Sequence, residues 1–166
     1  FVGEDLSADT LKKLIQKAYS TFDHAEVAPL SNLTENHHLL ELYHGPTLAF
    51  KDVALQFLGL LLDELLEQRA EGHAAQLTVL GATSGDTGPA AIEGLKGRDH
   101  VRIFMLYPHG RVSDFQRRQM TTVKAANVYP IAIEGTFDDC QHLVKGLFHD
   151  AGFRAEQNLT AINSIS

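Results

Sequence analysis

In the N-terminal part of the chain, apolar residues show helical periodicity in one segment and not in the residues that follow it. From Leu11 to Ala18 they recur at intervals of three and four behind a candidate N-cap, Ser7, which predicts a helix of about three turns. Residues 25–36 are rich in turn formers, and residues 38–43 are predicted to form a strand with imperfect alternation. This part of the chain therefore predicts a helix, a connecting loop and a strand.

Farther along the chain, helical patterns alternate with short, apolar runs. The strongest helix is predicted from Lys51 or Asp52 to about Ala70, with leucines on its buried face. The other predicted elements are helices over 89–95, 113–122 and 136–148, and strands over 77–80, 101–107, 128–133 and 159–162. Such alternation is typical of βαβ units. It predicts an α/β fold whose mainly parallel, open sheet has helices on both faces.

Composition agrees with a folded domain and narrows the class of partner. The 166 residues are 44% apolar and 21% charged, close to the average for soluble globular domains. We divide them into an N-terminal helix and connecting loop, residues 1–36, and an α/β domain, residues 37–166. The net charge of −7, with scattered basic residues, argues against nucleic acid as a partner. The longest apolar block, residues 53–66, falls short of the ~20 residues that cross a bilayer, so no membrane partner is expected.

Cysteine and histidine usage gives little sign of a disulfide or a metal site. Cys140 is the one cysteine, which suits a reducing cytoplasm, and we expect a cytoplasmic protein. Its place inside a predicted apolar helix favours a buried structural thiol over a nucleophile. The nine histidines show no metal-ligand spacing, so no metal is predicted. Because the chain starts at Phe1 and stops abruptly at Ser166, we expect it to be a segment of a longer protein.

Lys51 is the first candidate for chemistry. It is the one lysine between Lys17 and Lys96, and it stands between apolar residues and the most apolar helix of the chain. Apolar surroundings and the positive end of a helix dipole disfavour the ammonium form, so the pKa of Lys51 is expected to fall. A neutral amine is what a Schiff-base lysine needs. The alternative, which the local context alone favours, is a lysine reaching to water with its stem covering Phe50.

A Gly-rich loop, residues 83–88 (TSGDTG), is the second candidate. It lies at a predicted strand-to-helix turn, where backbone N–H groups and hydroxyls can bind a carboxylate or a phosphate. Its spacing matches neither a Walker A loop nor the dinucleotide fingerprint. The alternative is a capped helix start in which Ser84, Asp86 or Thr87 serves the backbone alone.

Taken together, the two loops resemble those of a known family. The matching segments, in chain order, are 44–52 (HGPTLAFKD), 82–88 (ATSGDTG), 106–108 (LYP), 110–113 (GRVS), 119–122 (QMTT), 134–141 (EGTFDDCQ) and 163–165 (NSI). They resemble the threonine synthases and, more broadly, the fold-type II enzymes that depend on pyridoxal phosphate (PLP). Segment 134–141 favours threonine synthase within that group. The resemblance implies that the chain is the smaller domain of that fold.

The resemblance also implies site residues. Lys51 would form the Schiff base with PLP and then move protons. The carboxylate of the amino-acid substrate would be held by residues of the Gly-rich loop: Thr83, Ser84, Gly85, Asp86 and Thr87. The implied reaction converts O-phospho-L-homoserine and water to L-threonine and phosphate. Arg111 is a candidate for the substrate phosphate, with a solvated surface arginine as the alternative, and Asn163 is placed near the active site.

Two other functions stay open at this point. One is a different fold-type II enzyme, such as a threonine dehydratase or a cysteine synthase-like enzyme. The other is a non-catalytic binding module on the same scaffold. Nothing after Gly152 resembles the second Gly-rich loop with which the family binds the PLP phosphate. We therefore expect little or no catalysis from these 166 residues alone, and the sequence leaves the oligomeric state open.

Overall fold

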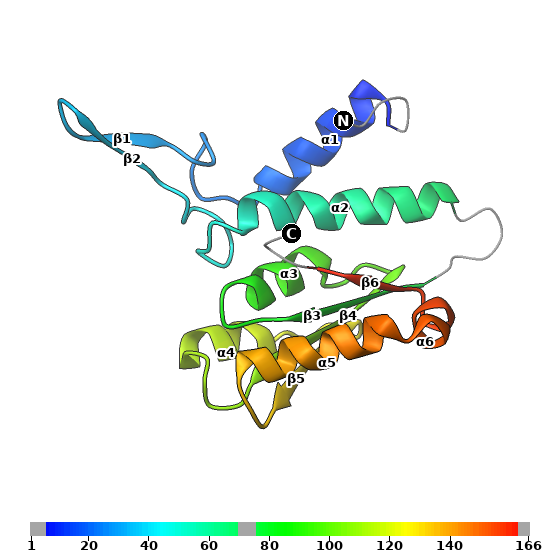
Figure 1. Cartoon of the computed structure of the whole chain (residues 1–166). Coiled ribbons are helices and arrows are strands. Elements are labelled where there is room, and N and C mark those ends of the chain that lie inside the picture. Colours follow the sequence, from blue (N-terminus) through cyan, green and yellow to red (C-terminus); the bar gives the residue numbers. More distant parts are fainter. Residues whose placement is uncertain (1–5, 70–75, 163–166) are drawn as a thin grey trace.

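A computed structural model describes residues 6–69 and 76–162 (Figure 1). The elements, in chain order, are α1 (Ala8–Tyr19), β1 (Leu30–Thr34), β2 (His37–Leu40), α2 (Asp52–Arg69), β3 (Leu77–Ala82), α3 (Thr87–Leu95), β4 (Val101–Pro108), α4 (Asp114–Thr121), β5 (Val128–Ile133), α5 (Phe137–His149), α6 (Ala151–Glu156) and β6 (Leu159–Ala161). None of the helices within the described ranges is long and apolar enough to cross a membrane.

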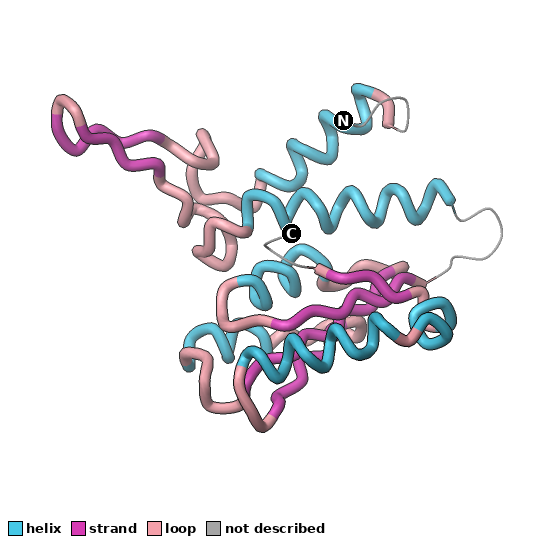
Figure 2. Tube along the Cα trace, in the orientation of Figure 1, coloured by secondary structure: helices cyan, strands magenta, loops and turns pink. Residues whose placement is uncertain are grey.

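A four-stranded parallel sheet with the order β5-β4-β3-β6 forms the centre of the fold. Helices α3 and α5 lie on opposite faces of this sheet, and α2 lies outside α3 (Figures 1 and 2). Helix α1 packs in turn on α2. The predicted α/β class, with a parallel sheet and helices on both faces, is therefore confirmed.

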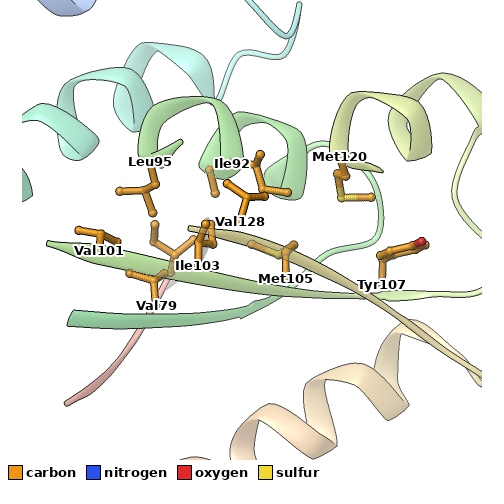
Figure 3. Packing of buried hydrophobic residues seen from close by; sticks show 11 residues of the cluster. Val79, Ile92, Leu95, Val101, Ile103, Met105, Tyr107, Met120 and Val128 are labelled. Atoms are coloured by element: carbon orange, nitrogen blue, oxygen red, sulfur yellow. The ribbon is translucent and has the colours of Figure 1, made fainter. Parts of the chain in front are cut away.

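The largest apolar cluster fills the space between the sheet and α3. Figure 3 shows its side chains meeting between these layers, with Val79, Ile103 and Met105 on the strands and Ile92 on the helix, all fully buried. Met120 of α4 joins the same cluster with no exposed surface. Strands β3 and β4 can be almost wholly apolar because both of their faces are covered.

A second cluster on the opposite face explains the single cysteine. Cys140 of α5 is fully buried against Leu80 and Leu106 of the sheet. Burial, with a smaller contribution from Asp139, raises the pKa of its thiol, which keeps the sulfur in its less reactive form. The predicted structural thiol is confirmed.

Helices α2 and α3 cross at two glycines. A Cβ added to Gly59 would lie 2.0 Å from the carbonyl oxygen of Gly94, and one added to Gly94 would lie 2.4 Å from that of Leu55. The two backbones can approach this closely because neither residue has a side chain. The segment that contains Lys51, residues 44–52 (the lysine loop), leads into α2, and the Gly-rich loop leads into α3, so this crossing holds the two loop-bearing helices close together.

The N-terminal part departs from the prediction. Residues 30–34, expected to be loop, form β1, and β2 is shorter than the predicted strand 38–43. The two strands pair antiparallel as a hairpin that projects from the helices and is separate from the parallel sheet (Figure 2). Nearly every residue of the hairpin is exposed, so no hydrophobic alternation marks it in the sequence. The expected boundary between residues 36 and 37 falls at the turn of this hairpin.

Candidate functional site

The two loops singled out in the sequence border one groove of about 470 Å³. Its side chains come from the lysine loop, the Gly-rich loop, helix α4 with its N-cap, and β2 with the segment after it. The lysine loop contributes an apolar wall, Leu48, Ala49 and Phe50, and β2 with the segment after it adds Leu39, Leu40, Leu42 and Tyr43. Most of the polar side chains come from the Gly-rich loop and α4 with its N-cap: Asp86, Ser113, Gln116 and Gln119. The groove therefore joins an apolar wall to a hydrogen-bonding wall.

Lys51 lies directly before α2 and next to Phe50 of the apolar wall, and it is not one of the residues that line the groove. Its carbonyl oxygen accepts hydrogen bonds from the first turn of the helix, from the N–H groups of Ala54 at 3.2 Å and Leu55 at 2.9 Å. Its side chain is half-buried, and its Nζ lies 4.5 Å from the centre of the Phe50 ring. This is a cation–π contact. The structural alternative also places Lys51 against Phe50, although through its stem and not its amine, so a contact with Phe50 alone does not decide between the two interpretations of Lys51.

The lysine loop carries backbone strain. Leu48 has a φ of 64°, a left-handed conformation that costs an ordinary L-residue about 1 kcal/mol or more. Such outliers persist where the surrounding contacts enforce them, and they concentrate at functional sites. The Leu48 side chain is exposed and lines the groove.

Asp52 is the residue that enforces this loop. Its carboxylate is fully buried and accepts from the Thr47 N–H at 2.7 Å, the Thr47 hydroxyl at 2.9 Å and the Gln56 amide at 3.0 Å. Burial raises the pKa of Asp52 above its ordinary value, although the bonds from Thr47 and Gln56 act in the opposite direction. Gly45 lies against this carboxyl, since a Cβ there would come within 2.4 Å of the Asp52 Cβ.

His44, the first residue of the motif that contains Lys51, ties the loop to the N-terminal part. Its Nδ1 lies 2.6 Å from Asp23 Oδ1, and its Nε2 lies 2.7 Å from Glu41 Oε2. Glu41 and then Asp23 raise the pKa of His44, because both ring nitrogens face carboxylates. Hydrogen bonds, first from Ser31 and then from His44, lower the pKa of Glu41 to about 2.

The Gly-rich loop is organised around Thr83. This buried side chain accepts from the N–H groups of Gly85 at 3.0 Å and Gly88 at 2.9 Å through its Oγ1. The hydroxyl of Thr83 thus shapes the loop. Ser84 is exposed, and Asp86 caps α3 through its backbone without a side-chain capping bond. Thr87 is the first residue of α3.

Between them, two glutamines of α4 contact both loops, although neither was assigned a role from the sequence. Gln116 Nε2 donates to Asp86 Oδ1 at 2.6 Å, and Gln119 Nε2 donates to the Thr47 carbonyl at 3.0 Å. Their spacing of three residues places both on one face of the helix. The signal available in the sequence was the QMTT segment, which begins at Gln119.

The remaining candidates lie elsewhere. Arg111 is exposed in the turn that follows β4, and its N–H donates to the Pro108 carbonyl at 3.2 Å. Asn163 lies outside the described residues. Within the described part of the chain, no three His, Cys, Asp or Glu side chains gather as a metal site.

Comparison with solved structures identifies the class of fold. Diaminopropionate ammonia lyase from Escherichia coli matches 96% of the chain with a TM-score of 0.61 at 14% identity, which is a likeness of fold alone. PLP-bound threonine synthase from Brucella melitensis matches 99% of the chain with a TM-score of 0.91 at 50% identity. The chain covers 35% of that structure. The fold is thus that of the fold-type II PLP-dependent enzymes.

Sequence comparison gives the family. Curated threonine synthases from Pseudomonas aeruginosa and Saccharomyces cerevisiae are each 52% identical to this chain, over 100% and 98% of its length. No family model matches the chain. The chain belongs to the threonine synthase family, and it spans about a third of the length of the curated relatives it matches.

Proposed function

We propose that the protein carrying this chain is a PLP-dependent threonine synthase, which converts O-phospho-L-homoserine and water to L-threonine and phosphate. The observation that carries the proposal is the convergence of the lysine loop and the Gly-rich loop on one groove, in a chain 52% identical to threonine synthases. We assign the chemistry to the α/β part, residues 37–166, and the protein to the cytoplasm, in keeping with its single, buried cysteine.

The residues present fit a carbonyl cofactor and an amino-acid substrate. Lys51 offers a primary amine beside the apolar wall, where it would hold PLP; when bound, PLP withdraws electrons from carbanions of the substrate. Ser84 presents an exposed hydroxyl at the N-terminal end of α3, where backbone N–H groups and the helix dipole favour a carboxylate. Gly85 and Gly88 let the loop pack tightly, since an added Cβ would lie 2.5 Å from Gln116 Oε1 at Gly85 and 2.6 Å from Thr83 Cγ2 at Gly88.

Attachment of PLP to Lys51 is the first test. The protein is incubated with PLP, reduced with borohydride and digested, and the modified peptide is identified by mass spectrometry. The proposal expects the label on Lys51 and its loss in Lys51→Ala. Lys124→Ala, which removes an exposed lysine outside the groove, serves as the matched control and is expected to keep the label. A reduced protein without label at Lys51 contradicts the proposal.

The substrate is tested by parallel turnover of O-phospho-L-homoserine, L-threonine and O-acetyl-L-serine. The proposal expects phosphate and threonine from the first and little turnover of the others. Preferred turnover of threonine would indicate a dehydratase, and preferred turnover of O-acetylserine a β-replacement enzyme. We expect little or no activity from the 166 residues alone, because no segment of them matches the family's PLP-phosphate loop. Threonine formation by this chain would overturn that expectation.

A further inference from the structure

Helix α4 lies against both loops of the groove, and the proposed function gives it no part. The helix begins with a capping box. The Ser113 hydroxyl accepts a hydrogen bond from the Gln116 N–H, and the Gln116 amide oxygen accepts one from the Ser113 N–H. Near its other end, the fully buried Met120 packs into the main apolar cluster. A short helix fixed at both ends moves little, so its remaining face is a rigid support for whatever it binds.

Gln116 fixes the Gly-rich loop. Its amide oxygen accepts from the Ser113 hydroxyl at 3.0 Å, which leaves the amide nitrogen to donate to Asp86 Oδ1 at 2.6 Å. The same amide covers Gly85, where an added Cβ would lie 2.5 Å from the amide oxygen. Gln116 therefore determines both where the Asp86 side chain lies and how the backbone passes Gly85.

Gln119 fixes the lysine loop in the same manner. Its amide nitrogen donates at 3.0 Å to the carbonyl oxygen of Thr47, a residue 72 positions earlier in the chain. Thr47 is in turn held by Asp52, the residue directly after Lys51. A displacement of α4 would therefore reach Lys51 through Thr47 and Asp52.

We propose that Gln116 and Gln119 are positioning residues that set the separation between the lysine loop and the Gly-rich loop. This inference rests on the proposed function, because it concerns how Lys51 is held relative to the loop assigned to the substrate carboxylate. Both side chains are neutral amides that donate hydrogen bonds to loop atoms, so they act through geometry and transfer no proton. The reaction rate is expected to be sensitive to this separation, since a misplacement of about 1 Å between reacting groups can cost about 100-fold in rate.

Amide hydrogen exchange of the protein without PLP is the first test. Gln116→Glu keeps the oxygen that completes the capping box but replaces the donor to Asp86 with a carboxylate, and it is expected to speed exchange in residues 83–90. Gln119→Met keeps the length of the side chain without a donor, and it is expected to speed exchange in residues 45–52. Losing one hydrogen bond of ordinary net strength corresponds to about a fivefold change.

Two further variants separate positioning from general destabilisation. Gln119→Lys restores a donor opposite the Thr47 carbonyl and is expected to recover most of the protection lost in Gln119→Met. Arg118→Ala removes an exposed side chain from the same helix and is expected to leave both segments unchanged. If Gln119→Met does not fold, Gln119→Glu provides the same test, because it also lacks the donor.

Steady-state kinetics of the PLP-loaded protein give the second readout. Gln116→Glu is expected to raise KM at least about fivefold, through the loop assigned to the substrate carboxylate. Gln119→Met is expected chiefly to lower kcat, through Lys51. Unchanged exchange in both segments overturns the proposal, and so does an equal change of KM and kcat in both variants. Because exchange is measured without PLP, a failure of PLP to attach to Lys51 would reject the proposed function and leave the exchange result standing.

Discussion

Replacing Gly59 with alanine tests the contact that positions the two loop-bearing helices. In most helix interiors, glycine to alanine stabilises a protein by about 1 kcal/mol, because alanine loses less backbone entropy on folding. At Gly59 the new Cβ would lie 2.0 Å from the carbonyl oxygen of Gly94, well inside van der Waals contact. The obstructing atom belongs to the backbone of α3, so it cannot rotate away as a side chain would.

The magnitude follows from these two opposing effects. Relief of the clash requires α2 and α3 to separate, which opens the contact between the leucines of α2 and the main apolar cluster. Overpacking of this kind costs about 1–3 kcal/mol, and a backbone obstruction belongs at the upper end. After subtracting the propensity gain, we expect a net loss of about 2 kcal/mol in the free energy of unfolding, or about 4–8 °C in Tm for a domain of this size.

The assay is urea and thermal unfolding followed by far-ultraviolet circular dichroism. Gly146→Ala is the matched control, because Gly146 lies inside α5 and an added Cβ there meets nothing within 4 Å. The control is expected to gain about 0.5–1 kcal/mol. A Gly59→Ala variant as stable as the parent, or more stable, would refute the assignment of this crossing as a close backbone contact.

Three further predictions concern buried or paired polar groups. Asp52→Ala removes the acceptor of the Thr47 N–H and hydroxyl and one of the two acceptors of the Gln56 amide, and it should cost about 3 kcal/mol in urea unfolding. Asp52→Asn should cost less, and equal losses would contradict the hydrogen-bond account. The raised pKa of His44 means that its protonated ring stabilises the fold. This contribution should be complete below the ordinary histidine pKa of about 6.5 and vanish as the pH rises through the pKa of His44 in the folded protein. An NMR titration of the ring checks the pKa shift, and His44→Gln should remove this pH dependence of stability. Cys140 should react with a thiol reagent in the native protein far more slowly than in denaturant, and rapid native labelling would contradict its burial.

The parts of the fold that the sequence predicts are those with a buried face. The leucines of α2 and the apolar runs of β3 and β4 cover the core, so their periodicity and length reveal them. The β1–β2 hairpin has no buried face and leaves no such pattern, which is why residues 30–34 were expected to be loop.

The residues of the candidate site also fall into those that the sequence predicts and those that it does not. Lys51 and the Gly-rich loop were found because their residue types and spacing are unusual, and the structure brings the two loops to one groove. Gln116 and Gln119 were missed because their partners lie 30 and 72 residues away, and a glutamine in a polar helix is unremarkable until those partners are known. Residue type also cannot separate a hydroxyl that binds substrate from one that binds its own loop, and Thr83 does the latter in this structure.

The two loops share one arrangement: a buried side chain holds the loop backbone, and the residue next to it is the one that we propose binds cofactor or substrate. In each, one buried side chain accepts nearby backbone N–H groups: Asp52 from Thr47, and Thr83 from Gly85 and from Gly88, the second residue of α3. The residue beside it lies before a helix: Lys51 is half-buried directly before α2, and Ser84 is exposed three residues before α3. Replacing the buried member should therefore lower the free energy of unfolding. Lys51→Ala should leave that quantity within about 1 kcal/mol of the parent while abolishing PLP attachment, since it removes a half-buried side chain whose cation–π contact with Phe50 is worth about 0.5–1 kcal/mol. A large loss of stability in Lys51→Ala would mean that the lysine side chain is needed to hold the loop, and would contradict this prediction.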